Sequence, residues 1–565
     1  MLALTLNPGF VPIVAALIAL AAPRTARPFV MGGAALVALW LLLENEFGAA
    51  AAMAQMGLPV VLLNLDALNR IFGIVMLILL VFIAVYSSGR RNRYEDAAIL
   101  LLAGGAISAL FVGDLVSFVA SAALAGLAAA WIVFASPLEN ANRSGVRLLI
   151  WHGLEGLLFL VGVALHLTAG AASSIFARMD VASMSGACIF AALMIRIGAP
   201  FAHVWLKDAV SHASPAGGAA LSSFTSIVGV YALARLFPVE TLLVPIGVAM
   251  IVIGAVFAAI EDDLRRAGAY ALTAQSGVCV ALIGVGSPLA LAAAEGHAFA
   301  ALLAFAALQM ALGGIVERTG SARLSDMKGV FRAMPMSSLV LLIAGLATAG
   351  APLLALYATQ TVALDAVAQW DLRWVWLAFA ALPGVLFVAL ALRPALVAHQ
   401  PLAKPRRFNE APFPMLLGAG LAAFLSVSIG LAPRWLYDLM PASLSFAPYE
   451  LERLAPRLEL LGAAGVAYVL LYVTKLAPKT LSERTLDIDA LYRGPMADAG
   501  RWAGVLLLRA YGAWQATATA SARSGGRLMA RAALRCDRPF APMRSSSVAQ
   551  FLSIAAILMI ILLFR

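Results

Sequence analysis

Residues 189–210 read IFAALMIRIGAPFAHVWLKDAV, an apolar run that is interrupted by Gly198-Ala199-Pro200. A proline inside a helix removes a backbone hydrogen bond and frees a carbonyl group, and a glycine loosens the turn before it. The same three residues recur as Gly350-Ala351-Pro352 after a second apolar run, LLIAGLATA at 341–349. We therefore expect two long apolar helices that are each broken by a Gly-Ala-Pro step.

The rest of the chain is as apolar as these two segments. Of its 565 residues, 63% are hydrophobic and only 12% are charged, whereas soluble domains carry about 25% charged residues. The apolar surplus has to face lipid, so the composition predicts an all-α polytopic membrane protein. The cysteines Cys188, Cys279 and Cys536 show no ligand-like spacing, so we expect no metal site, no disulfide and no cofactor.

Apolar runs of about 20 residues, the length that crosses the hydrocarbon core, occur about sixteen times in the sequence. We expect each run to form one transmembrane helix, with boundaries uncertain by a few residues. The runs lie near 7–22, 28–47, 66–88, 96–112, 114–136, 148–170, 181–203, 214–237, 241–260, 268–286, 289–315, 336–366, 374–397, 412–436, 457–477 and 546–564.

Basic residues concentrate in the loops that follow odd-numbered helices. The positive-inside rule places such loops in the cytoplasm and the N-terminus outside it. The net charge of +10 therefore indicates orientation in a membrane rather than binding to nucleic acid. One even-numbered loop, 437–456, is mixed, because Glu450 and Glu452 offset Arg453 and Arg457. The basic residues of the odd-numbered loops are Arg24, Arg27, Arg90, Arg91, Arg93, Arg143, Arg147, Lys207, Arg265, Arg266, Arg318, Arg323, Lys328, Arg332, Lys404, Arg406 and Arg407.

The composition changes in residues 478–545, which are rich in arginine. Four arginines repeat every four residues and so share one helical face. We expect an amphipathic helix that binds anionic lipid or a neighbouring subunit from the cytoplasmic side; a solvated basic face is the alternative. The four residues are Arg523, Arg527, Arg531 and Arg535.

The two Gly-Ala-Pro steps fall at matching places if helices four to eight and nine to thirteen form two repeats. Each step then lies on the fourth helix of its repeat, as in transporters built from inverted repeats with broken helices. Accidental Gly and Pro in alanine-rich helices are the alternative. The expected divisions are 1–94 for helices one to three, 95–237 and 238–400 for the repeats, 401–477 for the next helices, 478–545 for the basic segment and 546–565 for the last helix.

The motifs around the first break resemble the antiporter-like subunits of respiratory complex I and of Mrp-type multisubunit Na+/H+ antiporters. The main match is PFAHVWLKDA at 200–209, and TLDIDALYR at 485–493 looks like the extension of some D-type Mrp subunits. Shorter matches occur at 263–266, 286–290 and 318–326. The resemblance implies a 14-helix core with two inverted five-helix repeats, broken helices seven and twelve, and a row of buried charges that passes protons. The amphipathic helix and the extra transmembrane helices would be added to this core.

The sequence departs from the family at most of the charged positions that the resemblance implies. A glutamate of helix five is replaced, since Ala122 and Ala123 stand where the family has Trp-Glu. Arginine does not release its proton at workable pH, so Arg196 can bias a proton pathway but cannot relay protons. The other departures, with the helix-eleven histidine His297 retained, are Ile227 and Leu221 in helix eight, Ala301 and Phe305 in helix eleven and Gln360 in helix twelve.

Helix six offers a partial replacement, because His152, Glu155 and His166 share one face. A buried charge in a membrane costs about 2.5–3.5 kcal/mol on insertion scales and therefore has a partner or a role. We hypothesise that Glu155 pairs with Arg196; the alternative is that His152 and Glu155 reach the membrane interface.

Further candidates for the ion pathway lie on other helices. Glu295 and Asp365 are expected at water level near helix ends, whereas His203 belongs to the signature motif. Together with Arg196, His297, Gln360 and the three residues of helix six, they complete the candidate set.

The expected function is that of a D-type antiporter-like subunit in a bacterial inner membrane. Its partners would be other membrane subunits, the lipid bilayer, H+ and either Na+ or K+. One alternative is a scaffold subunit whose neighbours conduct the ions, and another is a membrane partner that energises uptake of a solute such as inorganic carbon. An enzyme is not expected, because no clustered ligand set, nucleophile elbow or phosphate loop is present.

Overall fold

The computed structural model describes residues 6–55, 58–89, 92–170, 175, 177–401, 408–441 and 444–476, with residues 487, 502, 505, 506, 509, 511–513 and 515 beyond them. The chain forms two compact units, Met1–Thr485 and Leu486–Arg565, and the bundle described below belongs to the first. The predicted basic segment with Arg523, Arg527, Arg531 and Arg535, and the predicted helix at 546–564, lie outside the described residues.

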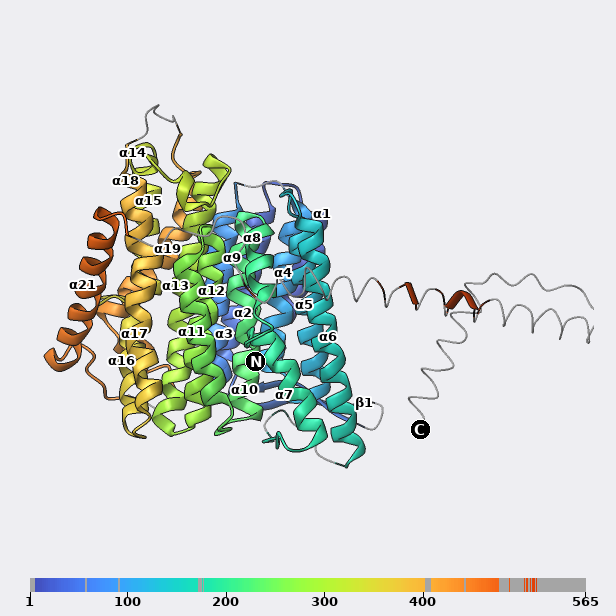
Figure 1. Ribbon diagram of the computed structural model, residues 1–565. Helices are drawn as coiled ribbons and strands as arrows, with labels where there is room; N and C mark the ends of the chain where they lie inside the picture. Colours follow the sequence, from blue (N-terminus) through green and yellow to red (C-terminus); the bar gives the residue numbers. More distant parts are fainter. Residues whose placement is uncertain are drawn as a thin grey trace, which may run out of the picture. The chain divides into compact units, whose positions relative to one another are not determined.

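Membrane-length helices dominate the first unit (Figure 1). Among the described residues, twelve helices are long and apolar enough to span a bilayer, and three shorter apolar helices accompany them, Phe10–Ala21, Met184–Ile197 and Pro335–Thr348. Each predicted span up to 457–477 coincides with one helix or with consecutive helical pieces. The prediction of a polytopic helical membrane protein is therefore confirmed.

The N-terminal part contains a hairpin that was not predicted from the sequence. Two antiparallel strands pair between the second and third helices, with Gly48 opposite Leu65 and Gln55 opposite Leu58. Asp66 then caps the third helix by accepting the N–H of Asn69. The elements are α1 (Phe10–Ala21), α2 (Arg27–Glu44), β1 (Gly48–Gln55), β2 (Leu58–Leu65) and α3 (Ala67–Ser87).

The next elements hold the expected helices four to eight. Asp114 caps α5 by accepting the N–H of Ser117 at 2.8 Å, so this span begins at a well-defined polar residue. Consecutive helices from α4 to α7 pack side by side. The elements are α4 (Arg93–Phe111), α5 (Leu115–Phe134), α6 (Ala141–Thr168), α7 (Met184–Ile197), α8 (Val204–His212), α9 (Pro215–Phe224) and α10 (Ser226–Leu236).

The following elements hold the expected helices nine to thirteen. The longest is α13, of 32 residues, which packs against α3, α9, α12, α15, α16 and α19 and so lies inside the bundle. The elements are α11 (Leu243–Ile260), α12 (Leu264–Val285), α13 (Pro288–Thr319), the 3-10 turn η1 (Leu324–Asp326), α14 (Val330–Ala333), α15 (Pro335–Thr348), α16 (Ala355–Ala368), α17 (Arg373–Leu386), the π-helical η2 (Phe387–Leu392) and α18 (Arg393–His399).

Three further helices complete the described bundle. α19 packs on α3 and α13, whereas α21 packs on α17 and η2 at the edge. Figure 1 shows α21 beside α17. The elements are α19 (Phe413–Leu431), α20 (Arg434–Tyr437) and α21 (Leu451–Val473).

The two Gly-Ala-Pro breaks have the same backbone geometry. α7 ends where Gly198 adopts φ +69° and α15 ends before Gly350 at φ +62°. Both ends close with the same pair of hydrogen bonds, since the glycine N–H reaches three residues back and the next N–H reaches five residues back. A second residue with positive φ follows three positions later, Phe201 in one break and Leu353 in the other. The matching breaks expected from the sequence are therefore present.

The segment after the first break differs from the sequence-based expectation. Helix seven was expected to end near residue 203, with Lys207 in a cytoplasmic loop. Instead, α8 continues to His212 and Lys207 is buried within it, 3% exposed. The Trp205 indole N–H donates to the carbonyl of Ile195 at 2.8 Å, which holds α8 against the end of α7.

Candidate functional site

Three buried polar side chains meet at the first helix break. Arg196 lies in the last turn of α7, and its Nε donates to Glu155 Oε1 at 2.5 Å. The other carboxylate oxygen of Glu155 lies 2.7 Å from His152 Nδ1, both residues being on α6. Arg196 Nη2 also donates to the carbonyl of Ala122 at 2.9 Å. The guanidinium thus joins α5, α6 and α7 at one point.

The predicted Glu155–Arg196 pair is therefore confirmed, and burial decides against the interfacial alternative. Glu155 is 1%, Arg196 2% and His152 7% exposed. His166 does not join this cluster: it is half-buried and lies about three turns further along α6.

The neighbours of the cluster fix its side chains. The rings of His152 and Trp205 lie 5.0 Å apart between centroids. Gly126 on α5 faces His152 so closely that a Cβ there would lie 3.1 Å from the histidine Cβ. Because α5 carries small residues here, α6 can approach and bring Glu155 to the place opposite Arg196.

Two polar atoms of the cluster remain without a hydrogen-bond partner, Arg196 Nη1 and His152 Nε2. A guanidinium carries a fixed positive charge, whereas an imidazole whose Nδ1 lies on a carboxylate, as that of His152 does, can bind a proton on its second nitrogen. The arrangement can therefore hold one movable proton beside a fixed positive charge.

A second polar cluster lies near the other break. His297 Nε2 is 3.0 Å from Gln275 Oε1, and the Gln275 amide donates to the carbonyl of Thr348 at 3.0 Å. Thr359 Oγ1 lies 3.4 Å from the other ring nitrogen of His297. His297 is fully buried and is linked to the end of α15 through the neutral side chain of Gln275.

Gln360, where the resemblance implies a lysine, is instead contacted by an arginine of another helix. Arg457 on α21 donates from Nη1 to Gln360 Oε1 at 3.0 Å. Both side chains are buried, 5% and 4% exposed. This contact was not predicted, because Arg457 was expected in a mixed loop. Arg457 lies four residues after Arg453, and this spacing indicates only that the two arginines share a helix face.

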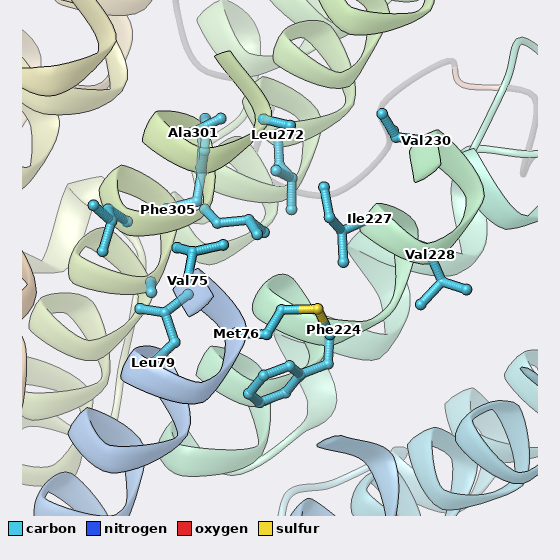
Figure 2. Packing of buried hydrophobic residues seen from close by; sticks show 14 of the residues in the cluster. Val75, Met76, Leu79, Phe224, Ile227, Val228, Val230, Leu272, Ala301 and Phe305 are labelled. Atoms are coloured by element: carbon cyan, nitrogen blue, oxygen red, sulfur yellow. The ribbon is translucent and has the colours of Figure 1, made fainter. Parts of the chain in front are cut away.

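An apolar core of buried side chains from α3, α9, α10, α12 and α13 lies within the bundle (Figure 2). Figure 2 shows Ile227, Leu272 and Phe305 turned toward one another among other apolar side chains. These three residues are between 1% and 4% exposed. Two of them, Ile227 and Phe305, occupy positions where the resemblance described above implies charge. The loss of charged residues at these positions, inferred from the sequence, thus corresponds to a packed apolar region.

The remaining candidate residues lie apart from these clusters. His203 is buried and packs with Phe257 and Tyr270. Glu295, expected at water level, is instead buried on α13 at 8% exposure. Asp365 is accessible, as expected, and accepts from Arg453 Nη2 at 2.9 Å.

A titratable group outside the spanning helices lies on the loop between α11 and α12. Burial raises the pKa of the Glu261 carboxyl above its usual value, and the nearby Arg266 and Lys207 oppose this shift. Among the residues that the structure describes, no group of three or more His, Cys, Asp or Glu side chains could hold a metal ion.

Residues 112–385 match the family described as NADH:quinone oxidoreductase/Mrp antiporter, TM. Over 162 residues the chain is 32% identical to the A/B subunit of a probable K(+)/H(+) antiporter of Rhizobium meliloti, covering 27% of this chain and 16% of that protein. Over 313 residues it is 29% identical to the N subunit of the NADH-quinone oxidoreductase of Desulforudis audaxviator, covering 51% of this chain and 62% of that protein. The matched region therefore spans less than two thirds of each relative.

A solved structure of the Mrp complex from Dietzia sp. DQ12-45-1b contains a chain with the same fold. The superposition has a TM-score of 0.73 and covers 95% of this chain and 64% of that chain. The sequence identity is 21%, so this likeness concerns the fold alone.

Proposed function

We propose that this chain serves as a D-type subunit of a multisubunit cation/proton antiporter; the match of residues 112–385 to the NADH:quinone oxidoreductase/Mrp antiporter family supports this proposal. In this role it contributes to translocation of H+ or Na+. The observation that carries the proposal is the buried His152–Glu155–Arg196 cluster at the first helix break.

The cluster has two charge states that differ by one proton. With His152 neutral, the charges of Glu155 and Arg196 cancel. When His152 accepts a proton, the cluster carries one net positive charge, which in a low-dielectric interior repels other cations strongly. Proton occupancy at His152 and cation occupancy nearby therefore oppose each other, which is the coupling that an antiporter requires.

The setting of this role is a bacterial inner membrane, with the N-terminus outside the cytoplasm and other membrane subunits as partners. The positive-inside distribution of Lys and Arg supports this orientation. The similar proteins from Rhizobium meliloti and Desulforudis audaxviator are bacterial, which supports a bacterial membrane. Their names describe them as subunits, which supports assembly of this chain with other membrane subunits.

The test is ion-driven dissipation of a pH gradient in everted vesicles that carry the assembled complex. Glu155→Gln keeps the side-chain shape but removes the negative charge opposite Arg196. We expect its rate on addition of Na+ or K+ to fall about tenfold or more, since one charge-assisted hydrogen bond is worth about 1.5–3 kcal/mol.

The matched control is His166→Gln, on the same helix but away from the cluster, which should retain the wild-type rate. Complex levels must be equal in all preparations. A wild-type rate for Glu155→Gln in an intact complex would show that the cluster is not part of the ion pathway.

A scaffold subunit is the second candidate, and the apolar region of Figure 2 favours it. Ile227 and Phe305 are packed among apolar side chains, and such a region neither binds protons nor orders water well. In a scaffold, the Glu155→Gln variant would affect assembly at most, and transport per assembled complex would stay unchanged.

A further inference from the structure

Arg457 carries a buried positive charge without a matching carboxylate. The ion pairs between described residues do not include Arg457, and Asp365 is paired with Arg453 instead. The guanidinium carbon lies 5.8 Å from the ring centroid of Tyr357, which gives a weak cation–π attraction. Taking an ion out of water costs much more than one such contact returns, so the aromatic ring does not offset the burial of the guanidinium.

The hydrogen bonds around Arg457 determine which kind of partner could offset that cost. Arg457 Nη2 and Gln360 Nε2 are both buried and have no partner. Gln360 Oε1, the acceptor of this pair, already receives Arg457 Nη1 at 3.0 Å. A guanidinium has no acceptor atom, so the two atoms of the pair that lack a partner are both N–H donors. Such a pair suits an anion and disfavours a cation.

A partly open cavity of about 430 Å³ gives access to Arg457. It lies between α16, α17 and α21, and its lining includes Asp365, Arg453, Arg457 and Glu452. Arg453 pairs with Asp365 at 2.9 Å and also with Glu450. A volume of this size holds several molecules of the size of water, each of which occupies about 30 Å³. A small hydrated ion can therefore reach the guanidinium.

We propose that Arg457 and Gln360 form a binding site for a small monovalent inorganic anion, which enters through this cavity. The anion accepts from Arg457 Nη2 and Gln360 Nε2 together, and its single negative charge lies against the guanidinium of Arg457. The site is separate from the His152–Glu155–Arg196 cluster and goes beyond the proposed antiporter function. An anion bound here would cancel a positive charge near the second helix break.

The test uses the purified protein in neutral detergent, with chloride as the probe. Sodium gluconate is exchanged for sodium chloride at constant ionic strength, and thermal unfolding is followed. For wild type we expect the Tm to rise and then saturate, by on the order of 3 °C at a hundredfold excess over Kd. Arg457→Gln should abolish the saturable rise. Gln360→Leu, which keeps the charge but removes one donor, should raise the chloride midpoint about tenfold.

Leu377→Ala is the matched control, because Leu377 lines the same cavity from α17 but carries neither a charge nor a side-chain hydrogen-bond donor. This variant should keep the saturable chloride response. If Arg457→Gln does not fold, the shifted midpoint of Gln360→Leu still tests the site. Equal Tm values in chloride and gluconate for wild type, or a wild-type response in Gln360→Leu, would overturn the proposal. Neither outcome depends on whether the His152–Glu155–Arg196 cluster conducts ions.

Discussion

At the scale of single residues, the pair of Arg196 and Glu155 shows that the carboxylate opposite this arginine can come from a helix other than α5. Ala122 and Ala123 leave no carboxylate at these positions of α5, and the carboxylate opposite Arg196 comes instead from α6. The α5 backbone still takes part, since the carbonyl of Ala122 accepts from Arg196 Nη2. The forked guanidinium reaches both acceptors at once, which the single ammonium group of a lysine cannot do in the same geometry.

This difference predicts a graded response at position 196. Arg196→Lys keeps the positive charge but loses one of the two charge-assisted contacts, so we expect transport between the wild-type and Arg196→Ala rates. Arg196→Ala leaves Glu155 buried with only His152 and should lower transport most. The measurement is dissipation of the pH gradient in vesicles with equal complex levels. A wild-type rate for Arg196→Ala would contradict this ranking.

Glu261 predicts a pH dependence of stability outside the spanning helices. Burial raises the pKa of this carboxyl in the folded protein. The folded protein therefore binds a proton at Glu261 more tightly than the unfolded chain does. The stability that this protonation contributes is fully present below the unfolded-state pKa and is lost as pH rises through the folded-state pKa. Glu261→Gln should therefore melt at a higher temperature than wild type at neutral pH, and the difference should shrink toward about pH 4. Thermal unfolding across this range measures it, with Glu139→Gln, at an exposed position, as the control. A difference that does not change with pH would contradict the assignment.

At the scale of elements, the two helix breaks have the same backbone conformation but differ in the side chains that surround the glycine. A Cβ on Gly350 would overlap with Gln360 Oε1, whereas a Cβ on Gly198 would lie 3.4 Å from the nearest atom, in His203. Both glycines have positive φ, which costs other residues about 1–2 kcal/mol. Gly350 therefore provides backbone freedom and also space for the Gln360 side chain.

We accordingly expect Gly350→Ala to be more harmful than Gly198→Ala. Gly198→Ala should cost about 1 kcal/mol of unfolding free energy, from the backbone alone. Gly350→Ala adds displacement of Gln360, which should bring the cost to about 2–3 kcal/mol. Thermal or denaturant unfolding of the two variants gives the comparison. Equal destabilisation would show that Gln360 moves aside freely.

Elements could be predicted from the sequence where the signal is local. Hydropathy located the spans, and Gly-Ala-Pro located both breaks, because backbone geometry at these residues follows from their own chemistry. The β1–β2 hairpin was missed, since 59–63, PVVLL, is too short for a span and its pairing depends on another strand. The pairing of Glu155 with Arg196 could be predicted from adjacent helices and charge. The contact of Arg457 with Gln360 could not, because it depends on how α21 packs against the bundle.

At the scale of the whole bundle, two polar clusters have been described, one beside each helix break. Ile227 and Phe305, where the resemblance implies charge, belong to the apolar core of Figure 2. Phe305 and Ile227 are 1% and 4% exposed, so packing at these positions is tight. The bundle therefore shares its fold with a chain of the solved Mrp complex and is packed with apolar side chains at Ile227 and Phe305.

This packing predicts that Phe305 supports the fold. Phe305→Ala would leave a cavity beside Ile227 and Leu272, and we expect a loss of about 3 kcal/mol in unfolding free energy. Leu339→Ala, at an exposed position of α15, should cost far less. Thermal unfolding in detergent compares the two. A negligible effect of Phe305→Ala would mean that this region is loosely packed.

The most direct test of a working ion site at the first break is a charge exchange between Glu155 and Arg196. Ion-driven dissipation of the pH gradient would be measured for Glu155→Arg, for Arg196→Glu and for the double variant, in vesicles with equal amounts of assembled complex. Each single variant places two like charges where the native atoms lie 2.5 Å apart and should abolish transport. The double variant restores opposite charges, and we predict that it recovers part of the wild-type rate. Wild-type rates in both single variants would contradict an ion site at this break and leave the chain as a scaffold.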